Sequence, residues 1–83
     1  MPKEDYHRAI ESLREETEAF DLYLQRAEKT QNEELKAIFL HNAKEEKEHS
    51  AMLLEWLRKQ DQELEKELKE YLFQEGEVAV NHQ

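Results

Sequence analysis

The sequence contains no cysteine, a single glycine and a single proline among its 83 residues. Without cysteine the chain forms no disulfide bond and offers no thiolate to a metal ion. One glycine and one proline leave little turn chemistry, so long helices are the predicted structure. Apolar runs are only a few residues long, so no membrane-spanning helix is predicted. The first seven residues lack the apolar stretch of a secretory signal.

Basic residues are few relative to acidic ones. The 12 lysines and arginines stand against 21 aspartates and glutamates, which gives a net charge of −9. Such a surface repels nucleic acid and anionic membranes, so we expect neither as a partner, and it attracts cations. Only 37% of the residues are hydrophobic. We therefore expect a bound metal, self-association or both to stabilise so small a domain.

Helix-forming residues dominate the sequence and predict one all-α domain over residues 1–83. Thr30, with Glu33 three residues later, has the spacing of a capping box that begins a second helix. Asp61 is a candidate cap for a third helix. The predicted elements are helices over about residues 5–29, 33–59 and 61–73, followed by a tail over residues 74–83.

Two apolar stripes predict that the first two helices form a long antiparallel hairpin. The stripe of the first helix has heptad-like spacing and comprises Ile10, Leu13, Thr17, Phe20, Leu24 and Ala27. The stripe of the second helix comprises Leu35, Ile38, Asn42, Glu46, His49, Leu53 and Trp56. Two helices alone do not enclose a core, so we expect two hairpins to dimerise into a four-helix bundle.

Polar residues interrupt these stripes at one level of the hairpin. If the turn is centred near Gln31, facing residues have numbers that sum to about 62, because both helices rise equally per residue. Glu16 then faces Glu46, and His49 lies one turn further along. Charged groups in a bundle interior must be paired, neutralised or bound to metal. The second Glu-x-x-His pair, Glu4 and His7, has no such facing partner.

One hairpin offers only half of a dinuclear metal site. Di-iron carboxylate bundles use a glutamate from each of two helices and a Glu-x-x-His pair from each of the other two. Two copies of this hairpin supply that set, and four carboxylates balance two divalent cations. Oxygen and imidazole ligands suit iron, manganese or zinc.

Three segments carry a resemblance to a known family. They are Glu15-Glu16-x-Glu18-Ala19-x-Asp21-x-Tyr23, Leu35-Lys36-Ala37-Ile38-x-x-His41-Asn42, and Glu45-Glu46-Lys47-Glu48-His49-x-Ala51-Met52-Leu53-Leu54-Glu55-Trp56-Leu57. A fourth segment, Tyr71-Leu72-Phe73-x-Glu75-Gly76, fits the same pattern. From about Tyr6 to Gly76 the chain resembles the encapsulated ferritins, the ferritin-like proteins associated with encapsulin shells. The chain departs from the pattern at Leu22, where an aromatic residue is expected, and residues 78–83 form no recognisable shell-targeting peptide.

The resemblance implies a ferroxidase centre that forms only at an interface between subunits of a ring-shaped homodecamer. Two iron ions would bind at each interface, where other divalent cations can substitute for them. Glu16, Glu46 and His49 would be the iron ligands, with Tyr23 close to the centre. Glu15 and Glu18 would form an outer acidic site where metal enters. The implied partner is an encapsulin shell protein, and the implied location is cytoplasmic, within an encapsulin nanocompartment used for iron storage.

Two other functions remain open from the residues alone. An acidic hairpin could oligomerise as a scaffold without any enzymatic activity, with Glu46 and His49 forming an interior hydrogen-bonded pair. A rubrerythrin-like di-iron half-bundle would instead act as a peroxidase. Glu15 and Glu18 are equally compatible with a solvated acidic face.

Overall fold

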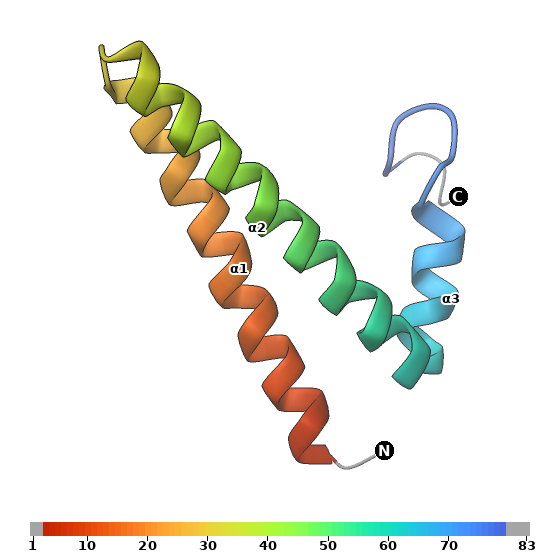
Figure 1. The fold of residues 1–83 in the computed structure, drawn as a ribbon. Helices are drawn as coiled ribbons and strands as arrows, with labels where there is room; N and C mark the ends of the chain where they lie inside the picture. Colours follow the sequence, from red (N-terminus) through yellow and green to blue (C-terminus); the bar gives the residue numbers. More distant parts are fainter. Residues whose placement is uncertain (1–2, 80–83) are drawn as a thin grey trace.

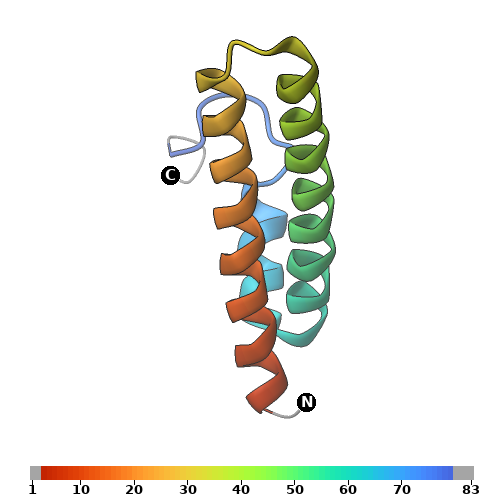
Figure 2. The same cartoon turned by 60° about the vertical axis from the view of Figure 1, so that its left-hand side comes forward.

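The computed structural model describes residues 3–79, which form three α-helices and no strand. Helices α1 (Lys3–Lys29) and α2 (Glu33–Gln60) run antiparallel and side by side, while α3 (Gln62–Tyr71) turns away from the end of α2 (Figures 1 and 2). The predicted all-α hairpin with a short third helix is therefore confirmed. Residues 74–79 of the predicted tail follow without regular structure. The rest of that tail, residues 80–83 with His82, lies outside the described residues.

The N-terminal cap of α2 is Asn32, so the predicted capping box of Thr30 and Glu33 is wrong. The Asn32 side chain accepts a hydrogen bond from the Leu35 amide at 2.9 Å. Thr30 directly follows α1, and its amide donates to the Arg26 carbonyl at 3.1 Å. Its hydroxyl accepts from the Asn32 amide at 3.2 Å and supports the loop instead.

Asp61 forms the junction between α2 and α3. Its backbone amide donates to the Arg58 carbonyl at the end of α2, and its side chain accepts from the Leu64 amide at the start of α3. The predicted cap of the third helix is therefore confirmed. The helix ends earlier than predicted, at Tyr71, because Leu72 is extended and Phe73 has a positive φ of 60° that a continuing α-helix does not allow.

Small side chains form most of the contact between α1 and α2. The buried residues are Ala9, Ala27, Ala43, Ser50 and Leu57. Small residues at these positions let the two helix backbones approach closely. Of the predicted apolar stripes only Ala27 is fully buried, whereas Thr17 is exposed and Leu35 and Ile38 are 40% and 50% exposed. One chain therefore leaves much of its apolar surface uncovered.

The dimensions of the chain also show that a single copy is less compact than a typical folded domain. Its accessible surface is 6874 Å², whereas a folded monomer of this mass exposes about 5300 Å². Its radius of gyration is 16.1 Å, against about 12 Å for a compact domain of this length. The smallest extent is 13 Å, close to the diameter of one helix. Within the described residues, no helix is both long enough and apolar enough to cross a membrane.

Candidate metal centre

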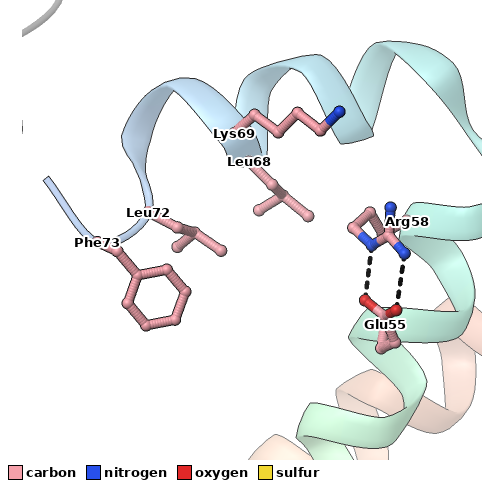
Figure 3. Close-up of a pocket in the computed structure, with 6 residues that line it drawn as sticks. All are labelled: Glu55, Arg58, Leu68, Lys69, Leu72 and Phe73. Atoms are coloured by element: carbon pink, nitrogen blue, oxygen red, sulfur yellow. Dashed lines mark hydrogen bonds and ion pairs between the residues drawn. The ribbon is translucent and has the colours of Figure 1, made fainter.

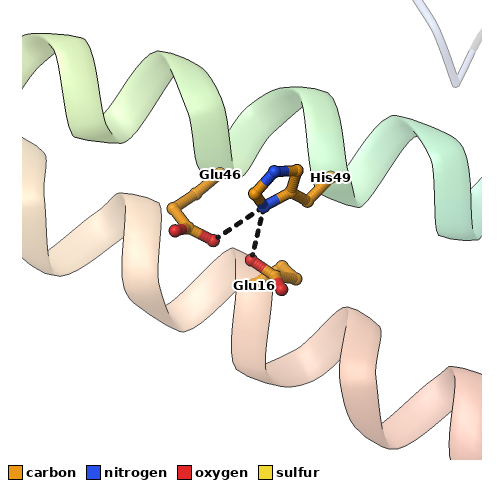
Figure 4. A group of neighbouring side chains, drawn as sticks. All are labelled: Glu16, Glu46 and His49. Atoms are coloured by element: carbon orange, nitrogen blue, oxygen red, sulfur yellow. Dashed lines mark hydrogen bonds and ion pairs between the residues drawn. The ribbon is translucent and has the colours of Figure 1, made fainter.

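Three side chains from the two long helices converge near the middle of the hairpin. Glu16 projects from α1, and Glu46 and His49 project from α2 one turn apart (Figure 4). Residues three apart on a helix lie on the same face, which places the carboxylate and the imidazole of α2 side by side. The register predicted from the turn brings Glu16 opposite them. Within residues 3–79, this is the one group of three or more histidine or acidic side chains whose donor atoms converge.

The spacing of the donor atoms suits a metal ion. One donor atom from each residue lies within 4.8 Å of the others. The Nδ1 atom of His49 lies 3.4 Å from an oxygen of Glu16 and 3.4 Å from an oxygen of Glu46. Two tetrahedral ligands at about 2.1 Å from a zinc-sized ion are about 3.4 Å apart. Small side-chain movements would therefore let all three residues hold one cation.

The group is only half enclosed by its own chain. The side chains of Glu16, Glu46 and His49 are 28%, 23% and 42% exposed. Carboxylate and imidazole donors suit iron, manganese or zinc, and the group of Glu16, Glu46 and His49 contains no sulfur atom to favour copper(I). Three side chains leave coordination positions open on the exposed side, where water, a substrate or a second chain can bind.

Ser50 follows His49 directly on α2. It is the buried polar residue of the hairpin, at 9% exposure, and its hydroxyl donates to the Glu46 carbonyl at 3.0 Å. This bond satisfies the hydroxyl within α2, so the small side chain can face α1 without an unpaired polar atom. The close approach of the two helices at this level brings Glu16 within reach of Glu46.

The structure does not bring the other predicted site residues into this group. Tyr23 is half-buried, and its ring lies against Phe39 with 6.2 Å between centroids and under the Arg26 guanidinium at 5.5 Å. Glu15 and Glu18 are exposed on α1 and are not members of the converging group. Of the second Glu-x-x-His pair, both Glu4 and His7 are exposed, and the His7 ring contacts Tyr6 edge-on.

A second polar cluster, around Asp61, was not predicted. The Tyr6 hydroxyl donates a hydrogen bond to the Asp61 carboxylate across 55 residues of sequence. This bond lowers the pKa of Asp61, with further help from the Leu64 amide, and raises the pKa of Tyr6. In the sequence, Asp61 is recognisable as a helix cap and Tyr6 as an aromatic residue of the first helix. No pattern in the sequence predicts that the two residues interact. The cluster tethers the start of α1 to the α2–α3 junction.

A groove between α2 and α3 was also not predicted. Arg58 holds both carboxylate oxygens of Glu55 at 2.6 and 2.7 Å and reaches Glu65 on α3 at 2.8 Å. The hydrogen bonds from Arg58 lower the pKa of Glu55. Figure 3 shows the apolar side chains on the α3 side of the groove. The groove encloses about 450 Å³ and is lined by Glu55, Arg58, Leu68, Lys69, Leu72 and Phe73.

Known proteins match nearly the whole chain. The EncFtn-like family model matches residues 2–75. An "Encapsulated ferritin-like protein" of Rhodospirillum rubrum is 53% identical over 74 residues, which cover 89% of this chain and 53% of that protein. A "Ferritin-like protein" of Thermotoga maritima is 46% identical over 75 residues, which cover 90% of this chain and 66% of that protein. The chain thus spans about half to two thirds of the length of these curated relatives.

A solved structure agrees with the sequence matches. The crystal structure of a protein from Nitrosomonas europaea superposes with a TM-score of 0.89 at 57% sequence identity, covering 95% of this chain and 89% of that one. The family match over residues 2–75 and the identity to these relatives confirm the predicted resemblance. The chain belongs to the encapsulated ferritin (EncFtn-like) family.

Proposed function

We propose that this chain is a ferroxidase that oxidises Fe(II) to Fe(III) with dioxygen at a di-iron centre shared by two copies of the chain. The observation that carries the proposal is the half-exposed group of Glu16, Glu46 and His49, with donor atoms within 4.8 Å of one another. Iron is the substrate, with two Fe(II) ions at each interface. Other divalent cations compete for the same oxygen and imidazole donors.

The need for a second copy follows from the number of ligands. One chain supplies two carboxylates and one imidazole, which is too few for two iron ions. Two chains supply four carboxylates and two imidazoles, the set used by ferritin-like di-iron bundles. Four negative charges then offset the four positive charges of two Fe(II) ions. The exposed side of the group and the large accessible surface of the chain, 6874 Å², both leave room for this partner.

The reaction removes one electron from each of two iron ions. Two Fe(II) ions, one dioxygen molecule and two protons give two Fe(III) ions and one hydrogen peroxide molecule. Anionic carboxylates attract Fe(III) more strongly than Fe(II), so Glu16 and Glu46 favour the oxidised state. His49 contributes the lone pair of Nδ1, the ring nitrogen that faces both carboxylates. Holding the two ions together lets one oxygen molecule accept both electrons.

The remaining predicted residues take supporting roles in this proposal. Glu15 and Glu18, exposed on α1, attract Fe(II) towards the centre, and this attraction weakens as salt is added. Tyr23 lies on α1 two turns from Glu16 and lines the interface beside the centre. The smallest extent is 13 Å, so the described part of the chain has no room to enclose mineral and oxidised iron must be stored elsewhere. The family relationship supports a ring-shaped decamer that works inside an encapsulin shell in the cytoplasm.

Replacing one ligand beside a matched neighbour tests the proposal. Glu46→Ala removes a carboxylate from the group, whereas Glu45→Ala removes the adjacent exposed one. We expect Glu46→Ala to lower the rate of Fe(II) oxidation at least tenfold and to weaken metal-dependent association, and Glu45→Ala to leave the oxidation rate per associated chain unchanged. Wild-type oxidation rates in Glu46→Ala would refute the proposal. Stable assembly of both variants without bound metal would favour the scaffold function.

A further inference from the structure

Met52 occupies an unusual position for an oxidisable side chain. It is 57% exposed, although large apolar side chains usually lie inside. It follows His49 by three residues on α2, so the thioether lies one turn from a ligand of the candidate metal centre. It is also the one methionine within the described residues 3–79. A single accessible thioether therefore stands beside the proposed site of oxygen reduction.

Two further exposed apolar side chains lie on the same flank of α2 as Met52 and His49, together with the exposed carboxylate of Glu45. Ile38 and Trp56 are 50% and 36% exposed. At about 100° per residue, these two residues, Met52 and His49 fall within an arc of about 60° on α2. The flank that presents the imidazole is therefore also the flank that exposes apolar side chains. A second copy that completes the ligand set must approach this flank.

We propose that Met52 is a site of oxidation to methionine sulfoxide, and that the sulfoxide weakens the pairing of two copies of this chain. The inference rests on the proposed function, which supplies the oxidant, hydrogen peroxide, and the pairing of copies over the His49 flank. Met52 takes no part in metal binding or in the oxidation of iron.

The oxidation step is an oxygen-atom transfer. A sulfur lone pair of Met52 attacks one oxygen of hydrogen peroxide, the O–O bond breaks, and the second oxygen leaves as water after proton transfer. Sulfur loses two electrons and peroxide gains them, so no further reductant or oxidant is required. The product is a polar S=O group in place of a flexible apolar one, a change that disrupts methionine-containing interfaces.

Pairing and oxidation therefore compete for the same side chain. In the single chain Met52 is 57% exposed and open to peroxide. In the paired state a second copy covers it. Burying the sulfoxide oxygen in that interface removes its hydrogen bonds to water, and an apolar surface offers no donor to replace them. This loss disfavours association. Peroxide that escapes the centre thus acts on the chains that have yet to pair.

Peptide mass spectrometry combined with sedimentation tests the proposal. The full chain is treated with hydrogen peroxide either without metal or after two copies have paired in the presence of Zn(II). Zn(II) is chosen because it has no redox chemistry. We expect sulfoxide at Met52 to form several-fold more slowly with Zn(II). We also expect two fully oxidised chains to pair in the presence of Zn(II) only at a protein concentration at least about tenfold higher than reduced chains need. Methionine sulfoxide reductase should restore pairing.

Met52→Leu is the matched control, since leucine has similar volume and no sulfur. For the wild type and for Met52→Leu, pairing is measured with and without peroxide treatment. Peroxide should leave the pairing of Met52→Leu unchanged. Equal pairing of oxidised and reduced wild-type chains would overturn the proposal, as would a Met52 oxidation rate that Zn(II) pairing leaves unchanged. Failure of the proposed function looks different, because untreated wild-type chains would then not pair in a metal-dependent manner at all.

Discussion

The Tyr6 hydroxyl donates a hydrogen bond to Asp61, which lies 55 residues away at the junction of α2 and α3. The same carboxylate caps α3 through the Leu64 amide, at 3.1 Å. One side chain therefore ties together the beginning of α1, the end of α2 and the start of α3. Because α3 projects away from the hairpin (Figure 1), its direction depends on this junction and on the ion pair of Arg58 with Glu65 rather than on a packed core.

Tyr6→Phe should destabilise the hairpin in a pH-dependent manner. The lost hydrogen bond should lower the melting temperature by a few degrees at neutral pH. The folded-state pKa of Asp61 is lowered by this bond, so its contribution is present above the unfolded-state pKa, about 4, and is lost as the pH falls through the folded value. The pKa of Tyr6 is raised, so its contribution is present below about pH 10 and is lost as the pH rises further.

The measurement is urea unfolding of metal-free protein, followed by circular dichroism, at acidic, neutral and alkaline pH. The difference between wild type and Tyr6→Phe should be largest near neutral pH and shrink at both extremes. Tyr23→Phe is the control, because the contacts of Tyr23 with Phe39 and Arg26 run through its ring. A difference between wild type and Tyr6→Phe that stays constant across the whole pH range would contradict the assignment.

Asn32→Ala should destabilise the chain by about 1 kcal/mol, the usual cost of losing an N-terminal cap. Its side chain accepts the Leu35 amide at 2.9 Å, and alanine leaves that amide without a protein partner. Thr30→Ala should cost less, since the Thr30 hydroxyl accepts one loop amide and caps no helix. Thermal unfolding of both variants decides between the two caps. A larger loss in Thr30→Ala would show that the box predicted from the sequence operates in solution.

Much of the fold and of the candidate site was predictable because both depend on helix geometry. Few turn residues predicted long helices, and one short loop fixed the register between them. That register alone placed Glu16 opposite Glu46 and next to His49, and the structure brings these three side chains together. The cap at Asp61 was equally predictable, because an aspartate at a helix start accepts a nearby amide wherever the chain leads.

Other features depend on how the helices and side chains are oriented relative to one another, which local sequence patterns do not predict. Ile38 and Thr17 belong to apolar stripes, yet they are exposed in the single chain, where the buried residues include Ala9 and Ala43 from outside those stripes. The bond from Tyr6 to Asp61 requires the extended backbone of Asp61 at the end of α2, for which the sequence has no signal. The positive φ of Phe73 was equally hidden, since no glycine marks the end of α3.

Ala43→Leu should uncouple the two halves of the candidate centre. Ala43 is 1% exposed at the contact with α1, one turn before Glu46, and leucine there forces the helices apart. Overpacking of this kind typically costs about 1–3 kcal/mol. We expect lower thermal stability together with weaker metal binding, because Glu16 moves away from Glu46 and His49.

The matched control for Ala43→Leu is Ala37→Leu, which adds the same atoms to an exposed position of α2. This variant should bind metal like the wild type. Calorimetric titration with Zn(II) at a temperature where both variants are folded compares the affinities. Wild-type affinity in a folded Ala43→Leu protein would show that the spacing of α1 and α2 does not control the group.

The central claim is that two copies of the chain complete one iron-oxidising centre. Fe(II) oxidation rate and iron content, measured across the fractions of a size-exclusion separation, test it most directly. The account predicts bound iron and rapid oxidation in the associated fractions, and an at least tenfold slower rate in the monomer fraction. Oxidation per chain as fast in the monomer fraction as in the associated fractions would contradict it.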